Sequence, residues 1–428
     1  MLQLGMNKLI QPVKGTRDFY PEDQAFQTWF YQKIREVSEI FGFQEYNGPF
    51  LEPLELYAAK SGQELVKKQA FTLTDQSGKT LALRPEMTPT LARMIAQKAG
   101  QLTFPVKWWT YGSRYRYEKP QKGRGREFFQ WDCDILGTEG YQADAEAIAV
   151  AATLYKKLGL TPAEVKIKIN DRQLLQDELT KIGVPQNLMV AVFRVADKKD
   201  KVSQTDFVQM LQELGLTNKQ AASIKKTLED KLLYQNSNWL KQIFALLEKY
   251  NIADFIEFDP AIVRGLEYYT RTVFEGWDVK GEFRAIWGGG RYDNLVADVG
   301  AKNKIPGVGF AMGDMVIAEV LKQYDKYPLL SANKTKVLVT VFSPDLYRKS
   351  LEIADILRIG NINTEVYLSP AVKIDKQLKY ADKKRIPFVA VCGPNEIETG
   401  SVAVKNMATG VQNTVKIKKL IDSISQTP

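Results

Sequence analysis

The stretch RYRYEKPQKGRGREFF, residues 114–129, has the pattern of a strand, a loop and a second strand. Its two arms belong to aromatic-rich segments, VKWWTYGSRYRYE (106–118) before the loop and REFFQWDCDILG (126–137) after it. The loop between them, residues 119–125, contains glycine, lysine and arginine. Runs of aromatic and β-branched residues bounded by a glycine-containing loop are typical of β-hairpins. We therefore predict a hairpin over this part of the chain.

The side chains of this hairpin suggest a nucleotide site. Arg116 projects from the first strand, and Glu118, two residues further on, lies on the same face. Arg124 and Arg126 follow where the chain returns, and Phe128 shares their face. Guanidinium groups bind phosphates, a carboxylate can accept from the exocyclic amine of a base, and an aromatic ring can stack on it. A merely basic surface hairpin is the alternative that this segment alone leaves open.

The amino-acid composition excludes several kinds of catalytic and metal-binding site. The chain of 428 residues has 44% hydrophobic and 25% charged residues, which is ordinary for a globular protein of two or three domains. It contains no histidine, which excludes an imidazole base and a histidine-ligated metal. Its two cysteines, Cys133 and Cys392, form no motif and suit a reducing cytoplasm. No apolar run approaches the roughly 20 residues needed to cross a bilayer, so no membrane association is expected.

The net charge of +9 is unevenly distributed. Residues 333–428 hold 15 Lys and Arg against 9 Asp and Glu, and residues 114–126 hold six basic residues against one glutamate. Basic concentrations of this kind attract the phosphates of nucleotides or nucleic acid. For the C-terminal region alone, a merely soluble surface explains the charge equally well.

Hydrophobic periodicity divides the chain into regions. Helices are expected over 25–42, 88–99 and 144–159, and a second hairpin over 69–85. Residues 170–256 carry the helical period with almost no strand signal, so we expect a helical insertion there.

After the insertion the sequence again has strand patterns, and from residue 333 strand and helix patterns alternate. Residues 257–328 contain the strand patterns, and 325–335 is a plausible linker. From residue 333, strand and helix patterns alternate to the end of the chain, which predicts a small α/β domain over 333–428.

Two further features have no obvious secondary-structure explanation. RGLEYYTRTVFE (264–275) places arginines, carboxylates and adjacent tyrosines where neither a helical face nor a strand alternation fits. IWGGGRYD (286–293) and PGVGFAMGD (306–314) are glycine-rich, but neither has the Walker lysine spacing or a Rossmann acidic residue downstream. We interpret their glycines as positions of close backbone packing beside a ligand or under a helix.

Together these segments resemble the class II aminoacyl-tRNA synthetases, and specifically the histidyl-tRNA synthetases. RYRYE resembles the second class motif, and GFQEYNGPFLEPLELY (42–57), with Pro49, resembles the first, which builds a dimer interface. RGLEYYTRTVFE is similar to the histidine-specific signature, and WGGGRYDNL to the element that follows it. LKYADKKRIPFVAVCG (378–393) resembles the anticodon-binding domain.

The resemblance implies a fold and a domain order. The fold would be an α+β catalytic domain, with an antiparallel sheet flanked by helices, and a C-terminal α/β anticodon-binding domain. Residues 1–169 and 257–328 would form the catalytic domain, 170–256 the insertion and 333–428 the anticodon-binding domain.

The resemblance also implies the reaction and the residues that perform it. The protein would be a cytoplasmic homodimer that uses ATP and Mg²⁺ to join L-histidine to tRNA(His). Arg264 and Arg116 would be catalytic, on either side of the α-phosphate. The residues expected to bind histidine are Glu86, Thr88, Gln130, Asp134, Arg264, Tyr268 and Tyr269. Those expected to bind ATP are Arg116, Glu118, Arg124 and Phe128.

One position departs from the family pattern. The third class motif normally supplies an arginine that braces ATP, and here Val316 stands in its place. Either other basic groups take over that contact or ATP binds less tightly. Two rival functions are a non-catalytic, synthetase-like regulatory subunit of ATP phosphoribosyltransferase and a generic RNA-binding module. The regulatory relatives lack the C-terminal domain, and an RNA-binding module leaves the pocket residues unexplained.

Overall fold

The computed structural model describes residues 10–58, 68–264 and 268–425. By its contacts the chain divides into two compact units, Met1–Asp18 with Thr28–Pro328, and Phe19–Gln27 with Leu329–Pro428. Between helix α12 (Asp314–Gln323) and strand β12 (Val337–Val339) the chain forms no regular element. None of the helices in the described ranges is both long and apolar enough to cross a membrane.

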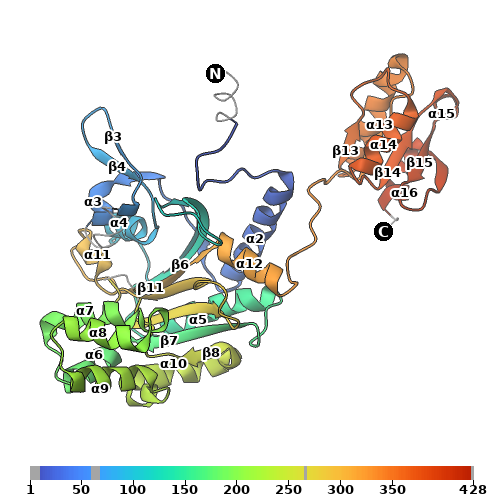
Figure 1. Ribbon diagram of the computed structural model, residues 1–428. Helices are drawn as coiled ribbons and strands as arrows, with labels where there is room; N and C mark the ends of the chain where they lie inside the picture. Colours follow the sequence, from blue (N-terminus) through green and yellow to red (C-terminus); the bar gives the residue numbers. More distant parts are fainter. Residues whose placement is uncertain (1–9, 59–67, 265–267, 426–428) are drawn as a thin grey trace, which may run out of the picture. The chain divides into compact units, whose positions relative to one another are not determined.

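An eight-stranded sheet is the centre of the larger unit (Figure 1). Its order is β1-β5-β6-β11-β10-β9-β7-β8. All pairs between β5 and β7 are antiparallel, and the two edge pairs, β1 with β5 and β7 with β8, are parallel. The strands are β1 (Gln44–Glu45), β5 (Val106–Tyr115), β6 (Glu127–Leu136), β7 (Val165–Asp171), β8 (Ile256–Phe258), β9 (Thr272–Asp278), β10 (Trp287–Arg291) and β11 (Gly307–Gly313).

The predicted hairpin is the pair β5 and β6, which runs in register from Val106 opposite Leu136 to Tyr115 opposite Glu127. β5 ends one residue before Arg116, whereas the sequence pattern placed that arginine on the strand. The pairing still continues, because the Arg116 amide donates to the Arg126 carbonyl at 2.9 Å. Arg116 therefore lies where the strand opens into the loop.

One face of the sheet is covered by helix α5 (Tyr141–Lys157), whose alanine-rich sequence lets it lie close to the strands. The Trp131 and Phe310 rings, from neighbouring strands, meet edge to face with centroids 4.8 Å apart. Trp287 Nε1 donates to the Tyr155 hydroxyl of α5 at 2.7 Å. These large side chains form a buried aromatic layer, in which Trp287 contacts α5.

Between β7 and β8 every element is a helix, in agreement with the helical period of this stretch. Ser203, Thr217 and Ser237 each cap a helix by accepting a backbone N–H, a contact worth about 1 kcal/mol. Buried apolar side chains, among them leucine, isoleucine and phenylalanine, form a common core of the first four helices, and the fifth packs against α5. The helices are α6 (Arg172–Lys181), α7 (Met189–Ala196), α8 (Gln204–Glu213), α9 (Asn218–Glu229) and α10 (Asn238–Lys249), with 3₁₀ turns at Gln186–Leu188, Lys199–Lys201, Leu233–Asn236 and Ala253–Phe255.

A small antiparallel sheet, ordered β2-β4-β3, lies near the start of the chain. It contains the predicted second hairpin, with Thr72 opposite Ala82. The elements of this region are α2 (Pro21–Ile40), β2 (Leu51–Pro53), α3 (Leu54–Ala58), β3 (Thr72–Thr74), β4 (Thr80–Leu83) and α4 (Thr88–Lys98), and the short helix α11 (Leu295–Asp298) packs against α4.

The smaller unit has its own five-stranded sheet, ordered β13-β12-β14-β15-β16. β12 pairs in parallel with both β13 and β14, and the remaining pairs are antiparallel. A core of valine, isoleucine and leucine residues lies between the sheet and its helices. The other elements are α13 (Tyr347–Ile359), β13 (Thr364–Val366), α14 (Ile374–Lys383), β14 (Phe388–Val391), α15 (Pro394–Glu398), β15 (Ser401–Asn406), β16 (Gln412–Lys416), α16 (Leu420–Ser425) and 3₁₀ turns at Pro344–Leu346 and Ile417–Lys419.

Candidate active site

A cavity of about 1170 Å³ lies over the central strands of the large sheet, and Phe310 and Trp287 of the aromatic layer are among its lining residues. Strand alternation explains which side chains line it, because residues two apart on a strand share a face. Phe128, Gln130, Asp132 and Asp134 of β6 all line the cavity. All eleven site residues expected from the sequence line this single cavity, although they come from segments far apart in the chain.

The glycines of β10 and β11 make room for the polar groups of the cavity. The register places Gly309 beside Asp134 of β6, and Gly288 beside Glu275 of β9. A Cβ atom on Gly309 would collide with the Asp134 carboxylate, and one on Gly288 with the Arg264 guanidinium. The glycines are therefore needed for close packing beside the site, as the sequence interpretation proposed, and both stretches form strands.

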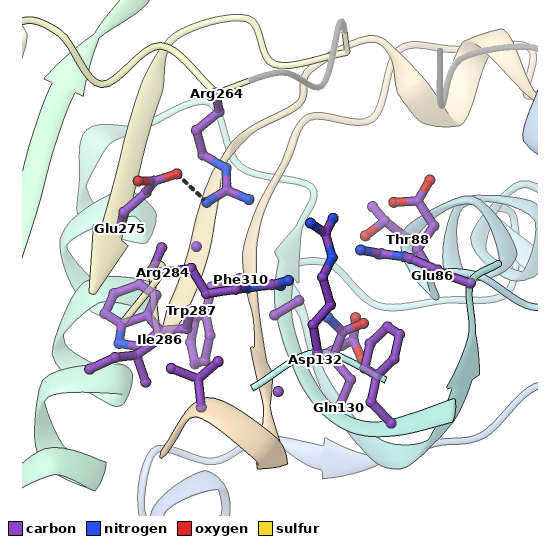
Figure 2. A pocket seen from close by; sticks show the side chains of 18 of the residues that line it. Glu86, Thr88, Gln130, Asp132, Arg264, Glu275, Arg284, Ile286, Trp287 and Phe310 are labelled. Carbon is purple, nitrogen blue, oxygen red and sulfur yellow. Dashed lines mark hydrogen bonds and ion pairs between the residues drawn. The ribbon is translucent and has the colours of Figure 1, made fainter. Parts of the chain in front are cut away.

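Arg264 is held in position by Glu275. Its Nη1 donates to Glu275 Oε1 at 2.7 Å (Figure 2). Its guanidinium carbon lies 6.0 Å from the centre of the Tyr269 ring. Burial opposes the positive charge, but the Glu275 carboxylate together with the two tyrosines and Asp197 outweighs it, and the pKa of Arg264 is raised. Its backbone is in the left-handed region, with φ at 54°. Gly265, Leu266 and Glu267, which follow it in the quoted signature, lie outside the described residues.

The inner end of the cavity contains a carboxyl group with an unusual pKa. Asp134 is 2% exposed, and burial raises its pKa from 3.8 to about 8. The Tyr292 hydroxyl donates to Asp134 Oδ1 at 2.6 Å, which limits that rise, and the nearby charge of Asp132 adds to it. Near neutral pH Asp134 is thus largely a neutral acid.

Polar groups from other segments surround Asp134. The Tyr268 hydroxyl donates to Glu86 Oε2 at 3.4 Å, and the Tyr268 and Tyr269 rings meet edge to face at 4.9 Å. Thr88 begins helix α4 at the same side of the cavity. The buried Gln130 Oε1 accepts no hydrogen bond from the described protein atoms, so it is available to a ligand donor.

At the other end, the loop after β5 contributes two arginines. Arg116 Nε donates to the Pro85 carbonyl at 2.9 Å, and its guanidinium carbon lies 5.2 Å from the centre of the Phe128 ring. Arg124 pairs with Glu118, with Nη2 and Oε1 2.6 Å apart. Arg126, which the sequence reading placed on the face of Phe128, lies over the Tyr117 ring at 4.0 Å instead.

Several lining residues were not assigned a role from the sequence. Glu275 and Tyr292 lie in segments that resemble family signatures. The resemblance was therefore the signal by which they could have been predicted. Asp197 and Lys201 line the cavity from the helical stretch, and Arg284 from the turn before β10. Nothing in the local sequence marks these last three, because only the tertiary fold brings them to the cavity.

Val316, which stands where the third class motif normally has an arginine, lies at the cavity. Val316 is 3% exposed in the first turn of α12 and lines the cavity beside Met315. Asp314, which begins the helix, is paired with Arg17 at 2.8 Å. The start of α12 therefore offers an apolar surface to this part of the cavity.

A family model described as histidyl-tRNA synthetase matches residues 15–315, and one described as anticodon binding domain matches residues 336–427. The chain belongs to the histidyl-tRNA synthetase family. This confirms the resemblance that the sequence motifs indicated.

Full-length relatives agree with the family models. The chain is 36% identical over 423 residues to the chloroplastic/mitochondrial histidine–tRNA ligase of Arabidopsis thaliana, covering 96% of this chain and 86% of that one. It is 33% identical over 434 residues to the histidine–tRNA ligase of Pyrococcus horikoshii, covering 97% and 99%.

Solved structures confirm the fold class. The histidyl-tRNA synthetase of Nostoc sp. PCC 7120 has a TM-score of 0.82 at 24% identity, with 98% of this chain and 99% of that one covered. A protein of Bacillus halodurans C described as ATP phosphoribosyltransferase regulatory subunit/histidyl-tRNA synthetase has a TM-score of 0.73 at 22% identity, covering 87% and 96%. At these identities both likenesses concern the fold alone.

Proposed function

We propose that this protein is a histidine–tRNA ligase, which activates L-histidine with ATP and transfers the histidyl group to the 3′ end of tRNA(His). The observation that carries this proposal is the cavity itself. One pocket brings Arg264 of the histidine-specific signature together with Arg116 and Glu118 of the second class motif. The family of the chain, and its relatives named histidine–tRNA ligase, support the same reaction.

In the first step the histidine carboxylate attacks the α-phosphorus of ATP, and pyrophosphate leaves. Negative charge develops on the α-phosphate oxygens, and the guanidinium groups of Arg116 and Arg264 are suited to stabilise it. Both are held before the substrates bind, Arg264 by Glu275 and Arg116 by the Pro85 carbonyl. Positioned charges of this kind need no imidazole base, which suits a chain without histidine.

The inner end of the cavity is proposed to bind histidine. Asp134, oriented by Tyr292, would hydrogen-bond the imidazole together with Tyr269. The ammonium group would lie among Glu86, Thr88 and Gln130, with Tyr268 beside it. A carboxyl group that can be neutral or ionised near pH 8 can accept from, or donate to, an imidazole whose own pKa is about 6.5.

The outer end is proposed to bind ATP. Phe128 would stack on the adenine, and Glu118 would accept from its exocyclic amine. Because Glu118 is paired with Arg124, binding would separate that pair and free Arg124 for the outer phosphates. Mg²⁺ is expected with ATP. The described residues hold no cluster of three or more acidic, cysteine or histidine groups fit to bind a metal, so the phosphates and water would supply most of its ligands.

The remaining parts of the chain have proposed roles too. Residues 333–428, basic overall, would bind the anticodon region of tRNA(His), and 170–256 would act as an insertion beside the catalytic parts, 1–169 and 257–328. Phe50, Leu51 and Leu73 are apolar and 40–50% exposed near the first class motif, as expected of a homodimer interface.

Two more points complete the proposal. Cys133 and Cys392 are free and buried, in keeping with a reducing cytoplasm. The alternative, a regulatory subunit, has no better support, because a C-terminal anticodon-binding domain is matched and Arg116, Glu118 and Arg264 are all present in the cavity.

The test is amino-acid-dependent exchange of pyrophosphate with ATP, measured across all twenty amino acids. We expect exchange with histidine alone, lost or slowed about 100-fold or more in Arg264→Ala. Arg35→Ala, which removes an exposed arginine paired with Glu39, is the control and should exchange normally. Exchange with another amino acid, or histidine binding with no exchange in the wild type, would refute the proposed reaction.

A further inference from the structure

Arg284 is an arginine of the cavity to which no role has been given. It lies in the turn between β9, which ends at Asp278, and β10, which begins at Trp287. It lines the cavity and is exposed to solvent there. Figure 2 shows its side chain extending into the pocket below the Arg264–Glu275 pair. The turn thus places the Arg284 guanidinium in the same cavity as Arg116 and Arg264, the arginines proposed to act in the chemical step.

Arg284 differs from its neighbours in having no hydrogen-bonding or ion-pair partner among the described residues. Arg264 is paired with Glu275, Arg124 with Glu118, and Arg116 donates to a backbone carbonyl. Within the described part of the chain, Arg284 makes no hydrogen bond, ion pair or ring contact. A guanidinium group has five N–H donors that match the geometry of phosphate oxygens. An arginine left without a carboxylate inside a cavity is therefore poised for an anionic ligand.

The charges around Arg284 indicate what kind of anion. Desolvation by the surrounding protein, followed by the positive charge of Arg124, lowers the pKa of Arg284. The Glu118 carboxylate opposes this shift, and Arg116 and Arg264 add to it. The four guanidinium groups thus act on one another through the same cavity. A single carboxylate would neutralise one of them, whereas a polyphosphate can reach several.

The apolar surface at Val316 explains why such a residue is needed. Met315 and Val316 line the cavity at the start of α12 without supplying a charge. A Cβ atom on Gly123, in the loop after β5, would lie 3.2 Å from Val316 Cγ2, so the valine is in close contact with that loop. A cation for the outer phosphates in addition to Arg124 must therefore come from another element, and the turn before β10 provides one.

We propose that Arg284 binds the outer phosphates of ATP, and the pyrophosphate released from them, in place of the arginine that the third class motif lacks. The proposal rests on the proposed function, because it assumes that this cavity binds ATP. It assigns to one side of the nucleotide a ligand that comes from the turn between β9 and β10. Arg284 would contact the phosphates directly, so its loss should weaken ligands that carry them and spare those that do not.

The experiment is isothermal titration of the full-length protein with ATP, pyrophosphate and AMP, each with Mg²⁺. The variants are Arg284→Ala, Arg284→Lys and, as a matched control, Lys280→Ala. Lys280 is an exposed cation of the same turn that does not line the cavity; its ammonium lies 5.1 Å from the centre of the Tyr324 ring. Because Arg284 makes no hydrogen bond, ion pair or ring contact with the described residues, its variants are expected to melt like the wild type, which circular dichroism would check.

The expected result is selective. Arg284→Ala should raise the Kd for ATP and pyrophosphate about ten- to hundredfold, the loss expected for a charge-assisted contact, and change the Kd for AMP less than twofold. Arg284→Lys should lie between, because it keeps the charge and loses the bidentate geometry.

Three outcomes would count against the proposal. Unchanged ATP affinity in Arg284→Ala would overturn it, and so would a parallel loss of ATP and AMP, which would place Arg284 at the base. Failure of the wild type to bind ATP would instead refute the proposed function, and with it this inference.

Discussion

Replacing Asp134 with asparagine is expected to change how the stability of the larger unit depends on pH. Burial raises the pKa of Asp134 from 3.8 to about 8 in the folded protein. The unfolded chain releases this proton near the ordinary value, whereas the folded protein keeps it. Between the two pKa values the folded state binds more protons, so the free energy of unfolding falls as the pH rises.

The size of the effect follows from the same numbers. The loss is about 1.4 kcal/mol per pH unit below the raised pKa, and it levels off near pH 8. From about pH 6 to about pH 8, the wild type should therefore lose about 2 kcal/mol relative to Asp134→Asn. The asparagine can still accept from the Tyr292 hydroxyl, and its amide faces the open cavity. Subtracting the two pH profiles cancels the other titrating groups.

Urea denaturation followed by tryptophan fluorescence would measure this difference. All seven tryptophans lie between residues 29 and 287, so the signal reports on the larger unit alone. Asp177→Asn, which removes an exposed carboxylate on α6, is the control and should leave the pH profile unchanged. Parallel profiles for the wild type and Asp134→Asn, or a wild type that gains on the variant as the pH rises, would refute the reasoning.

Three further changes test other contacts. Gly288→Ala places a methyl group against the Arg264 guanidinium and should slow histidine-dependent pyrophosphate exchange about 100-fold, whereas Gly100→Ala, in open space, should leave it normal. Arg291→Ala leaves the buried aspartate that this arginine contacts at 3.0 Å without its ion-pair partner. It should lower the free energy of unfolding, measured by urea denaturation, by about 3–5 kcal/mol. Gln377→Ala leaves buried backbone groups of the smaller unit unpaired at about 1–3 kcal/mol each, and should speed amide hydrogen exchange across β12 and α14.

Much of the secondary structure could be predicted, because the hydrophobic pattern carries it. The hairpin at 106–137 and the helix at 144–159 are both long and strongly patterned, and both are present. The stretch after residue 257 was less predictable. β8 is three residues long and β9 begins only at Thr272, and Arg264 and the two tyrosines, which lie between these strands in the sequence, line the cavity.

The site could be predicted where a motif marks it. Arg116 and Glu118 lie two residues apart before the loop, Phe128 follows on the returning strand, and RGLEYYTRTVFE matches a family signature. Tyr292 and Arg284 could not be assigned from such spacing. Their roles depend on which strands neighbour one another, and strand order follows from contacts between residues far apart in sequence.

By itself, the sequence determined which chemistry is available. Without histidine and with two isolated cysteines, the protein must work with guanidinium, carboxylate, phenol and amide groups, and the motif order named the family that uses them in this way. The tertiary structure alone decided the pairings and the charge states. Asp134 has its raised pKa because the strands around it exclude water, Arg264 fits because a glycine lies opposite it, and Arg284 reaches the cavity because β9 and β10 are neighbours. Burial, close contact and strand order depend on the packing of distant segments, which no short stretch of sequence contains.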